Sequence, residues 1–222
     1  MINSRIYLIG GAERTLGQLK DLYDIIDTII LQSNTKQILH VPFAKPLQDY
    51  QNTGWYKWFI NRKEKYSYID FLNARLNADL LNAEYPLIFI NGGSDHIGLY
   101  NSINSNTLLK KTILNAKYLV AECSGSSVLG AFYRMSDNNP KLVKGLNIIK
   151  DTIIEPHYIT RNRVGLLRKE LLESDARIGI GLDNLTGIEF SKFEFPIKIS
   201  RIGHGKIDIF KKLNDKILRL NI

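Results

Sequence analysis

The sequence predicts an α/β protein built on a mostly parallel sheet, with an antiparallel extension in its C-terminal third. Short apolar runs alternate with helical patterns over the first two thirds of the chain, which favours right-handed strand–helix–strand units. The central runs at 86–90 and 117–122 are almost continuously apolar, as expected of strands buried on both faces. After residue 177, short strand patterns separated by turn signals predict the antiparallel part.

The individual elements follow from apolar periodicity and from glycine and proline positions. Residues 5–9 end at Gly10-Gly11 and residues 37–41 end at Pro42, so both are predicted strands, whereas residues 16–31 carry apolar side chains at helical spacing. The further strands are predicted at 66–72, 86–90, 117–122, 152–155, 177–182, 186–190, 196–201 and 206–211, and the further helices at 49–61, 74–81, 95–102, 106–115 and 161–173. The chain shows no repeat, low-complexity tract or linker, so we expect a single domain over residues 1–222.

Composition excludes several classes of function. Hydrophobic residues make up 44% and charged residues 23% of the 222 residues, which is ordinary for a soluble globular protein. No apolar run approaches the roughly 18 residues of a membrane span, and the N-terminus lacks the pattern of a secretion signal. A single cysteine, Cys123, fits a reducing compartment, so we expect a cytoplasmic protein without a membrane partner. The net charge of +8 is scattered along the chain, so we expect no nucleic-acid partner.

The most informative feature is Ser124, which follows an apolar run and opens the small-residue stretch Ser124-Gly125-Ser126-Ser127. A strand that turns tightly into a helix can present a serine hydroxyl at the rim of a parallel sheet. His157 supplies a candidate base, because a neutral imidazole can take the hydroxyl proton. Asp137 lies between them in the chain and supplies a candidate carboxylate to orient the imidazole. The sequence therefore offers the three groups of a serine hydrolase.

An oxyanion hole can be proposed from glycine backbone groups. The N–H of Gly125, together with that of Gly92 or Gly93, could stabilise the negative charge of a tetrahedral intermediate. We predict no metal and no cofactor, because no histidines or cysteines have ligand spacing and neither glycine-rich loop matches a phosphate-binding motif.

Two observations weaken the assignment of Ser124. A serine at the start of a helix commonly caps free N–H groups, and Glu122 and Ser126 occupy the flanking positions where the pattern G-x-S-x-G has glycine. From strand alternation we expect the Cys123 side chain to point away from that of Ser124 and to be a small buried hydrophobe rather than a nucleophile.

Taken together, these residues resemble peptidase family S51, which contains dipeptidase E (aspartyl dipeptidase) and cyanophycinase. The resemblance runs from about Arg5 to Phe190 and is carried by four stretches in the family's order. They are Ile88-Phe89-Ile90-Asn91-Gly92-Gly93-Ser94-Asp95, Ala121-Glu122-Cys123-Ser124-Gly125-Ser126-Ser127, Gly145-Leu146-Asn147-Ile148-Ile149 with Ile154-Glu155-Pro156-His157-Tyr158, and Ile178-Gly179-Ile180-Gly181-Leu182-Asp183-Asn184-Leu185-Thr186.

The resemblance implies a flavodoxin-like three-layer α/β sandwich related to class I glutamine amidotransferases, with Ser124 as nucleophile and His157 as base. The family's dipeptidases imply Asp137 as the third member. Its cyanophycinase-like members use a glutamate where this chain has Asn184, which favours Asp137 and leaves Asp183 in reserve.

The family also implies cleavage beside an acidic residue. The substrate carboxylate would then meet Arg161 or Arg163, with Asn91 also at the substrate site. The expected protein is a monomeric or homodimeric serine exopeptidase acting on short acidic peptides through an acyl-enzyme. The alternatives are a diverged, weakly active or inactive member acting as a binding protein, and a cyanophycinase-like hydrolase of aspartyl peptides.

Overall fold

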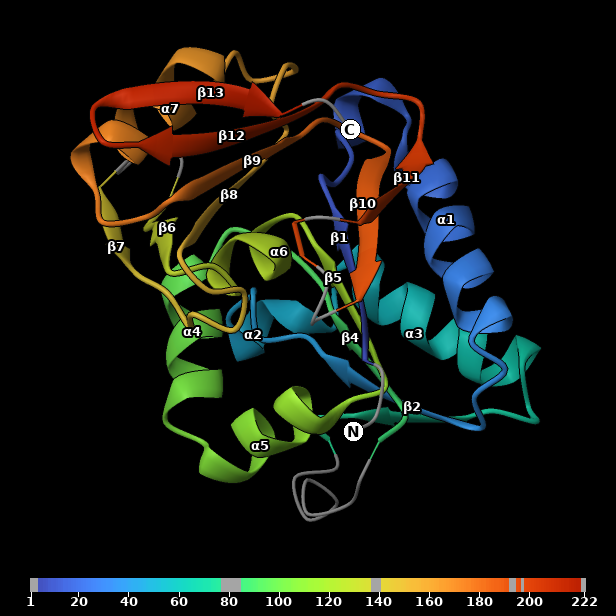
Figure 1. Cartoon of the computed structure of the whole chain (residues 1–222). Helices are drawn as coiled ribbons and strands as arrows, with labels where there is room; N and C mark the ends of the chain where they lie inside the picture. Colours follow the sequence, from blue (N-terminus) through green and yellow to red (C-terminus); the bar gives the residue numbers. More distant parts are fainter. Residues whose placement is uncertain (1–3, 77–84, 137–140, 192–194, 197, 221–222) are drawn as a thin grey trace.

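The computed structural model describes residues 4–76, 85–136, 141–191, 195–196 and 198–220 (Figure 1). Within these ranges the chain forms two mixed sheets with helices packed around them. The strands of the larger sheet are β1 (Arg5–Ile9), β2 (Gln37–Val41), β3 (Asp70–Asn73), β4 (Leu87–Ile90), β5 (Tyr118–Glu122), β10 (Thr186–Ser191) and β11 (Ile199–Gly203).

The larger sheet has the order β11-β10-β1-β5-β4-β2-β3. Its central strands β1, β5, β4, β2 and β3 are all parallel, as their apolar sequences predict, and β10 and β11 extend it in antiparallel fashion. The predicted α/β class and the antiparallel extension are therefore confirmed for this sheet.

A second sheet corrects the expectation of a single three-layer sandwich. Its strands run in the order β13-β12-β9-β8-β6-β7, with β6, β8 and β9 parallel and β7, β12 and β13 antiparallel to their neighbours. They span β6 (Phe132–Arg134), β7 (Leu142–Lys144), β8 (Thr152–Pro156), β9 (Ile178–Leu182), β12 (Ile207–Leu213) and β13 (Lys216–Leu220). Strand β8 lies between β6 and β9 and is buried along its whole length, because Ile154 on one face packs in the core shared with the larger sheet and Ile153 on the other packs with side chains of α7.

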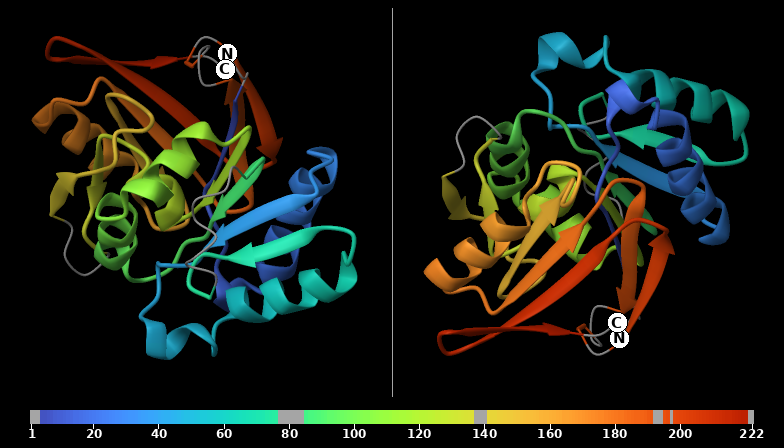
Figure 2. Two further views of the ribbon diagram at one scale, coloured as in Figure 1. Left: turned by 90° about the horizontal axis from the view of Figure 1, so that it is seen from below. Right: turned by 90° about the horizontal axis from the view of Figure 1, so that it is seen from above.

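The helices are distributed over the faces of both sheets (Figure 2). Apolar side chains of α1 and α3 pack on one face of the larger sheet, and those of α4, α5 and α6 lie in the core on its other face, which the second sheet shares. Helix α7 packs on the second sheet. The helices are η1 (Arg14–Leu16), α1 (Leu19–Gln32), α2 (Leu47–Tyr50), α3 (Gly54–Lys65), α4 (His96–Asn104), α5 (Thr107–Asn115), α6 (Ser124–Val128) and α7 (Val164–Glu173).

Several predicted boundaries differ from the structure. The predicted helix at 49–61 is two helices, because Thr53 starts a new one by accepting a hydrogen bond from the N–H of Tyr56. The predicted helix at 74–81 falls largely outside the described residues. Strands β6, β7 and β13 were not predicted, because their short sequences mix apolar with charged side chains. Among the described helices, none has the length and apolar character needed to cross a membrane.

Candidate active site

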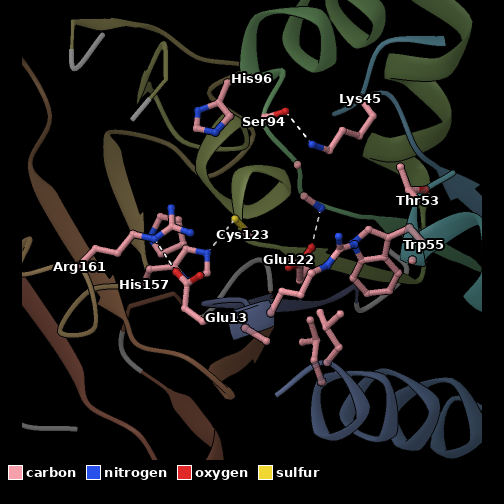
Figure 3. A pocket seen from close by; sticks show the side chains of 18 of the residues that line it. Glu13, Lys45, Thr53, Trp55, Ser94, His96, Glu122, Cys123, His157 and Arg161 are labelled. Atoms are coloured by element: carbon pink, nitrogen blue, oxygen red, sulfur yellow. Dashed lines mark hydrogen bonds and ion pairs between the residues drawn. The ribbon is translucent and has the colours of Figure 1, made fainter. Parts of the chain in front are cut away.

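The carboxyl ends of strands from both sheets meet at one edge. Strand β1 leads into Gly10-Gly11, β4 into Asn91-Gly92-Gly93 and β5 into Cys123, while β8 of the second sheet leads into His157 and β9 into Asn184. In sheets of this kind, ligands bind at the carboxyl ends of the strands. This edge borders a cavity of about 500 Å³ (Figure 3).

Cys123 occupies the sharp turn between β5 and α6. Its backbone has φ 51° and ψ −121°, a conformation that a residue other than glycine adopts only under constraint from its surroundings. Its Sγ lies 3.2 Å from Nε2 of His157, and both side chains line the cavity (Figure 3). The prediction that Cys123 is a buried hydrophobe pointing away from the site is wrong, because strand alternation ends at Glu122 and the turn redirects the next side chain.

Ser124 lies on the first turn of α6 and is fully buried. Its hydroxyl accepts a hydrogen bond from the N–H of Gly93 at 2.9 Å and donates one to the carbonyl of the same residue at 3.0 Å. The structure therefore engages the Ser124 hydroxyl with the loop after β4, and it brings Cys123 rather than Ser124 to the ring of His157.

The far side of the imidazole faces an amide. Nδ1 of His157 lies 2.6 Å from Oδ1 of Asn184, whose Nδ2 donates to Oε1 of Gln18 at 2.8 Å. The Gln18 oxygen also accepts from the backbone N–H of Glu13. Because this oxygen can only accept, Asn184 must turn its own oxygen toward the imidazole. Nδ1 then carries the proton, and Nε2 presents a lone pair to the Cys123 thiol.

The charge state of His157 is set by burial. Its exposed fraction is 2%, and burial, with the Arg161 guanidinium nearby, lowers the pKa of His157 to about 4. The hydrogen bond to Asn184 and the Glu13 carboxylate, 3.4 Å from Nδ1, oppose this shift only in part. The imidazole is therefore neutral near pH 7, which is the form that accepts a proton.

Of the two predicted carboxylates, only Asp183 lies among the described residues. Asp137 lies outside the described residues. Oδ1 of Asp183 accepts hydrogen bonds from the backbone N–H groups of Ile159 and Thr160 and from the Thr160 hydroxyl. Asp183 therefore holds the loop that follows His157 in place. Its neighbour Asn184 is the residue that contacts the imidazole ring.

The predicted oxyanion-hole glycines surround the turn. The N–H of Gly92 donates to Oε2 of Glu122 at 2.5 Å, and the N–H of Gly93 donates to Ser124. Gly125 lies inside α6, and a Cβ at that position would approach the carbonyl oxygen of Ile90 to 2.4 Å. Gly125 therefore allows α6 to pack directly on the end of β4.

Gly11, which follows the predicted strand at 5–9, lies against the side chains of His157 and Cys123. It has φ +97°, and a Cβ there would lie 2.9 Å from Cε1 of His157 and 3.1 Å from Cβ of Cys123. Only a glycine combines this backbone conformation with so close an approach.

The predicted substrate-binding residues differ in their surroundings. Arg161 lines the cavity and donates through Nε to Glu13 at 2.6 Å. Arg163, which also lines the cavity, is 8% exposed and donates to Glu155 at 2.6 Å. Asn91 is 2% exposed; its Oδ1 lies 2.7 Å from Nε2 of His40, and its Nδ2 donates to the carbonyl of Gly92. Asn91 therefore supports the Gly92-Gly93 loop from its buried side.

A signal for the turn was present in the sequence but displaced by one position. In Ala121-Glu122-Cys123-Ser124-Gly125, the final glycine of the pattern G-x-nucleophile-x-G is Gly125, which puts the nucleophile position at Cys123 with alanine in place of the first glycine. Asn184 carried a weaker signal, because an amide can orient an imidazole as a carboxylate does. Gln18 carried none, since its role depends on the packing of the segment before α1.

Comparison with known proteins shows the family and the fold of this chain. The family model of peptidase family S51 matches residues 6–197. The chain is 29% identical over 134 residues to a cyanophycinase of Geminocystis herdmanii (strain PCC 6308), a match that covers 55% of this chain and 48% of that protein. The match thus spans about half the length of this curated relative.

Two solved structures share the fold. A peptidase from an acI-B1 Actinobacterium superposes with a TM-score of 0.61 at 16% identity, covering 98% of this chain and 94% of that one. A putative peptidase E protein from Listeria monocytogenes EGD-e superposes with a TM-score of 0.58 at 13% identity, covering 91% and 100%. The resemblance stated from the sequence is confirmed: this chain belongs to peptidase family S51.

Proposed function

We propose that this chain hydrolyses peptide bonds in short peptides with the Cys123 thiol as nucleophile, His157 as general base and Asn184 as the residue that orients the imidazole. The observation that carries the proposal is the 3.2 Å contact between Sγ of Cys123 and Nε2 of His157 at a turn held in a left-handed conformation. A nucleophile and base within bonding reach, with a third group on the base, is the arrangement that covalent hydrolysis requires.

The reaction follows from the tautomer of His157. Nε2 takes the thiol proton as Sγ attacks the carbonyl carbon of the scissile bond, and the Nδ1–H bond to Asn184 stabilises the imidazolium that forms. The imidazolium then gives its proton to the leaving amine, and a thioester remains on Cys123. His157 next deprotonates a water molecule that attacks the thioester, which releases the acid product and restores the thiol.

The oxyanion requires donors near Cys123. The backbone N–H of Ser124 follows the nucleophile at the start of α6, where helix N–H groups have no partner within the helix. The N–H groups of Gly92 and Gly93 lie on the neighbouring loop, with Glu122 and Ser124 as their present acceptors. We assign the first donor to Ser124 and the second to this loop.

The charge of the cavity favours a substrate with a carboxylate. Arg14, Lys45, Arg161 and Arg163 line it, and Lys45 donates to the neutral hydroxyl of Ser94 at 2.8 Å. A cation whose hydrogen-bond acceptor is uncharged retains more of its attraction for an anion. We therefore propose cleavage beside an acidic residue.

The test is an assay of short peptides with an acidic residue on either side of the scissile bond. Wild-type protein should release both products, and Cys123→Ala should lose about 10³-fold or more of kcat/KM. Ser124→Ala is the matched comparison, because it removes one side-chain oxygen from the adjacent position. Equal loss in the two variants, or turnover by Cys123→Ala at the wild-type rate, would remove the thiol from the mechanism.

A further inference from the structure

A carboxylate lies at the floor of the cavity that the proposed reaction does not use. Glu122 is the last residue of β5, adjoins Cys123 and is 5% exposed, with its side chain lining the cavity. Oε2 accepts the N–H of Gly92, and Oε1 has no hydrogen-bond partner among the described residues. Oε1 is not among the described buried atoms that lack a partner, so it is accessible from the cavity that Glu122 lines. An accessible carboxylate oxygen can accept a strong hydrogen bond from a charged donor on a ligand.

No cation of the described residues forms an ion pair with Glu122. Arg161 pairs with Glu13 and Arg163 with Glu155. Burial raises the pKa of Glu122 to about 7, and the only opposing influence is the hydrogen bond from Gly92. Arg14 and Lys45 line the same cavity, but neither lies within ion-pair distance of this carboxylate.

Aromatic rings stand on the same side of the cavity. Glu122 continues the face of β5 that carries Tyr118 and Val120, which packs on the aromatic side chains of α1 and α3. At the cavity, Tyr23 and Trp55 meet edge to face with ring centroids 5.1 Å apart. Figure 3 shows Trp55 and Glu122 bordering the open space from neighbouring walls. Aromatic faces attract organic cations, and the attraction is larger where water is excluded.

We propose that Glu122, together with Trp55 and Tyr23, forms a subsite for an ammonium group of the substrate, beside the scissile carbonyl at Cys123. This inference deepens the proposed function and rests on it. An ammonium supplies the donor that Oε1 lacks, satisfies the buried charge and contacts the rings. A substrate that carries both an ammonium and a carboxylate would engage Glu122 and the cations that line the cavity, such as Lys45, together.

The test uses the single cysteine of the chain and needs no hydrolysis. Cys123 is treated with three methanethiosulfonates, and the rate constants are obtained from intact mass. One carries a neutral n-propyl group, which matches the cationic 2-ammonioethyl group of the second in size, and the third carries an anionic 2-sulfonatoethyl group. Because the same thiol reacts each time, the ratio of cationic to neutral rate constants reports the electrostatics of the cavity alone.

Glu122→Gln keeps an oxygen for the Gly92 N–H and removes the charge, so the ratio should fall about tenfold or more. Lys45→Gln is the matched control, because it removes a cation from the same cavity, and the ratio should rise. A ratio for Glu122→Gln within twofold of wild type overturns the subsite. If the thiol reacts with none of the reagents, both the subsite and the proposed nucleophile are contradicted. If Glu122→Gln lowers the ratio as expected but wild-type protein hydrolyses no peptide, the proposed function is contradicted and the subsite is not.

A second measurement covers the case in which Glu122→Gln does not fold. In wild-type protein the ratio of cationic to neutral rate constants should rise between about pH 6 and 8 as Glu122, whose pKa burial raises to about 7, ionises. His96 also faces the cavity, so the series is repeated with His96→Gln. Persistence of the rise in His96→Gln supports Glu122, and its loss overturns the assignment.

Hydrolysis assays then identify the source of the ammonium. Peptides with lysine or norleucine test a side-chain ammonium, and free or acetylated N-termini test an α-ammonium. Wild-type protein should prefer one charged form by about tenfold, and Glu122→Gln should lose that preference. Equal kcat/KM values for charged and neutral members of both pairs would contradict the subsite.

Discussion

Sγ of Cys123 and Nε2 of His157 lie 3.2 Å apart, and the two residues come from different sheets. Cys123 follows β5 of the larger sheet, and His157 follows β8 of the second. Their contact depends on how the two sheets pack, because the carboxyl end of β5 in the larger sheet must lie beside the carboxyl end of β8 in the second sheet. Both residues have positive φ values, of 51° and 50°, so each side chain is aimed by a constrained backbone.

The first prediction concerns Asn184. Asn184→Asp places a negative charge beside Nδ1, which raises the pKa of His157 from about 4 and shifts the acidic limb of the kcat/KM profile to higher pH. Asn184→Ala removes the orienting oxygen without adding charge, so kcat should fall about 10- to 100-fold without that shift. Identical acidic limbs in wild type and Asn184→Asp would show that Asn184 does not act on the ring.

The second prediction separates close approach from backbone strain. Gly11→Ala and Gly17→Ala both place alanine at a positive φ, but only Gly11 has the pair His157 and Cys123 within contact of the added Cβ. Both variants should lose about 1–2 kcal/mol of unfolding free energy. Gly11→Ala should in addition lower kcat/KM about tenfold or more, because it displaces the imidazole.

Gly17→Ala is the control in this comparison, because its added methyl group would enter open space. Nothing lies within 4 Å of a Cβ at Gly17, so Gly17→Ala should retain wild-type kcat/KM. Equal activity losses in the two variants would indicate that backbone strain, and not contact with His157, limits the reaction.

The third prediction concerns stability and pH. Burial raises the pKa of Glu122 from 4.5 to about 7, so the folded protein binds a proton more tightly than the unfolded chain does. The resulting stabilisation is complete below about pH 4.5 and is lost as the pH rises through about 7. Glu122→Gln lacks this effect. The unfolding free energy of Glu122→Gln minus that of wild type should therefore be roughly 2–3 kcal/mol larger at pH 8 than at pH 5.

Urea unfolding of both proteins at the two pH values measures this difference. The comparison removes the opposite contribution of His157, whose lowered pKa makes the protein less stable as the pH falls below about 6.5. A difference between the proteins that is the same at pH 5 and pH 8 would rule out a raised pKa for Glu122.

The fourth prediction assigns Ser124 a structural role. Ser124→Ala leaves the N–H and carbonyl of Gly93 without their hydroxyl partner, which should cost about 1–3 kcal/mol of unfolding free energy. Ser127→Ala is the control on the same helix, since its hydroxyl makes one long bond of 3.5 Å to the carbonyl of Cys123. A larger loss in Ser127→Ala than in Ser124→Ala would contradict this role.

Much of the fold could be predicted from the sequence, because buried parallel strands are nearly all apolar. The strand predictions at 37–41 and 86–90 coincide closely with β2 and β4. The division into two sheets could not be predicted, since Ile153 of β8 and Ile188 of β10 have equally apolar surroundings in the sequence. Which sheet each strand joins depends on long-range packing.

Part of the candidate site could be predicted from the sequence, and Asp137, the predicted third member, lies outside the described residues. His157 and the glycine loop after β4 lie at the cavity as expected, whereas the contact with His157 involves Cys123 and the contact with Nδ1 involves Asn184. The alternation that directed Cys123 away from the site holds only inside a strand. It fails where the backbone turns to positive φ. The pattern that indicates this turn at Cys123 has Gly125 as its final glycine but alanine in place of its first one, which weakens the signal.

Whether Cys123 is the nucleophile is tested best by trapping the acyl-enzyme and locating the modified residue. An activated ester of a short acidic peptide is mixed with wild-type protein, Ser124→Ala and Cys123→Ala, and the quenched adducts are located by peptide mass spectrometry. We expect a hydroxylamine-sensitive thioester on Cys123 in wild type and in Ser124→Ala, and no adduct in Cys123→Ala. An adduct carried by Ser124, or one that persists in Cys123→Ala, would contradict the assignment of the nucleophile.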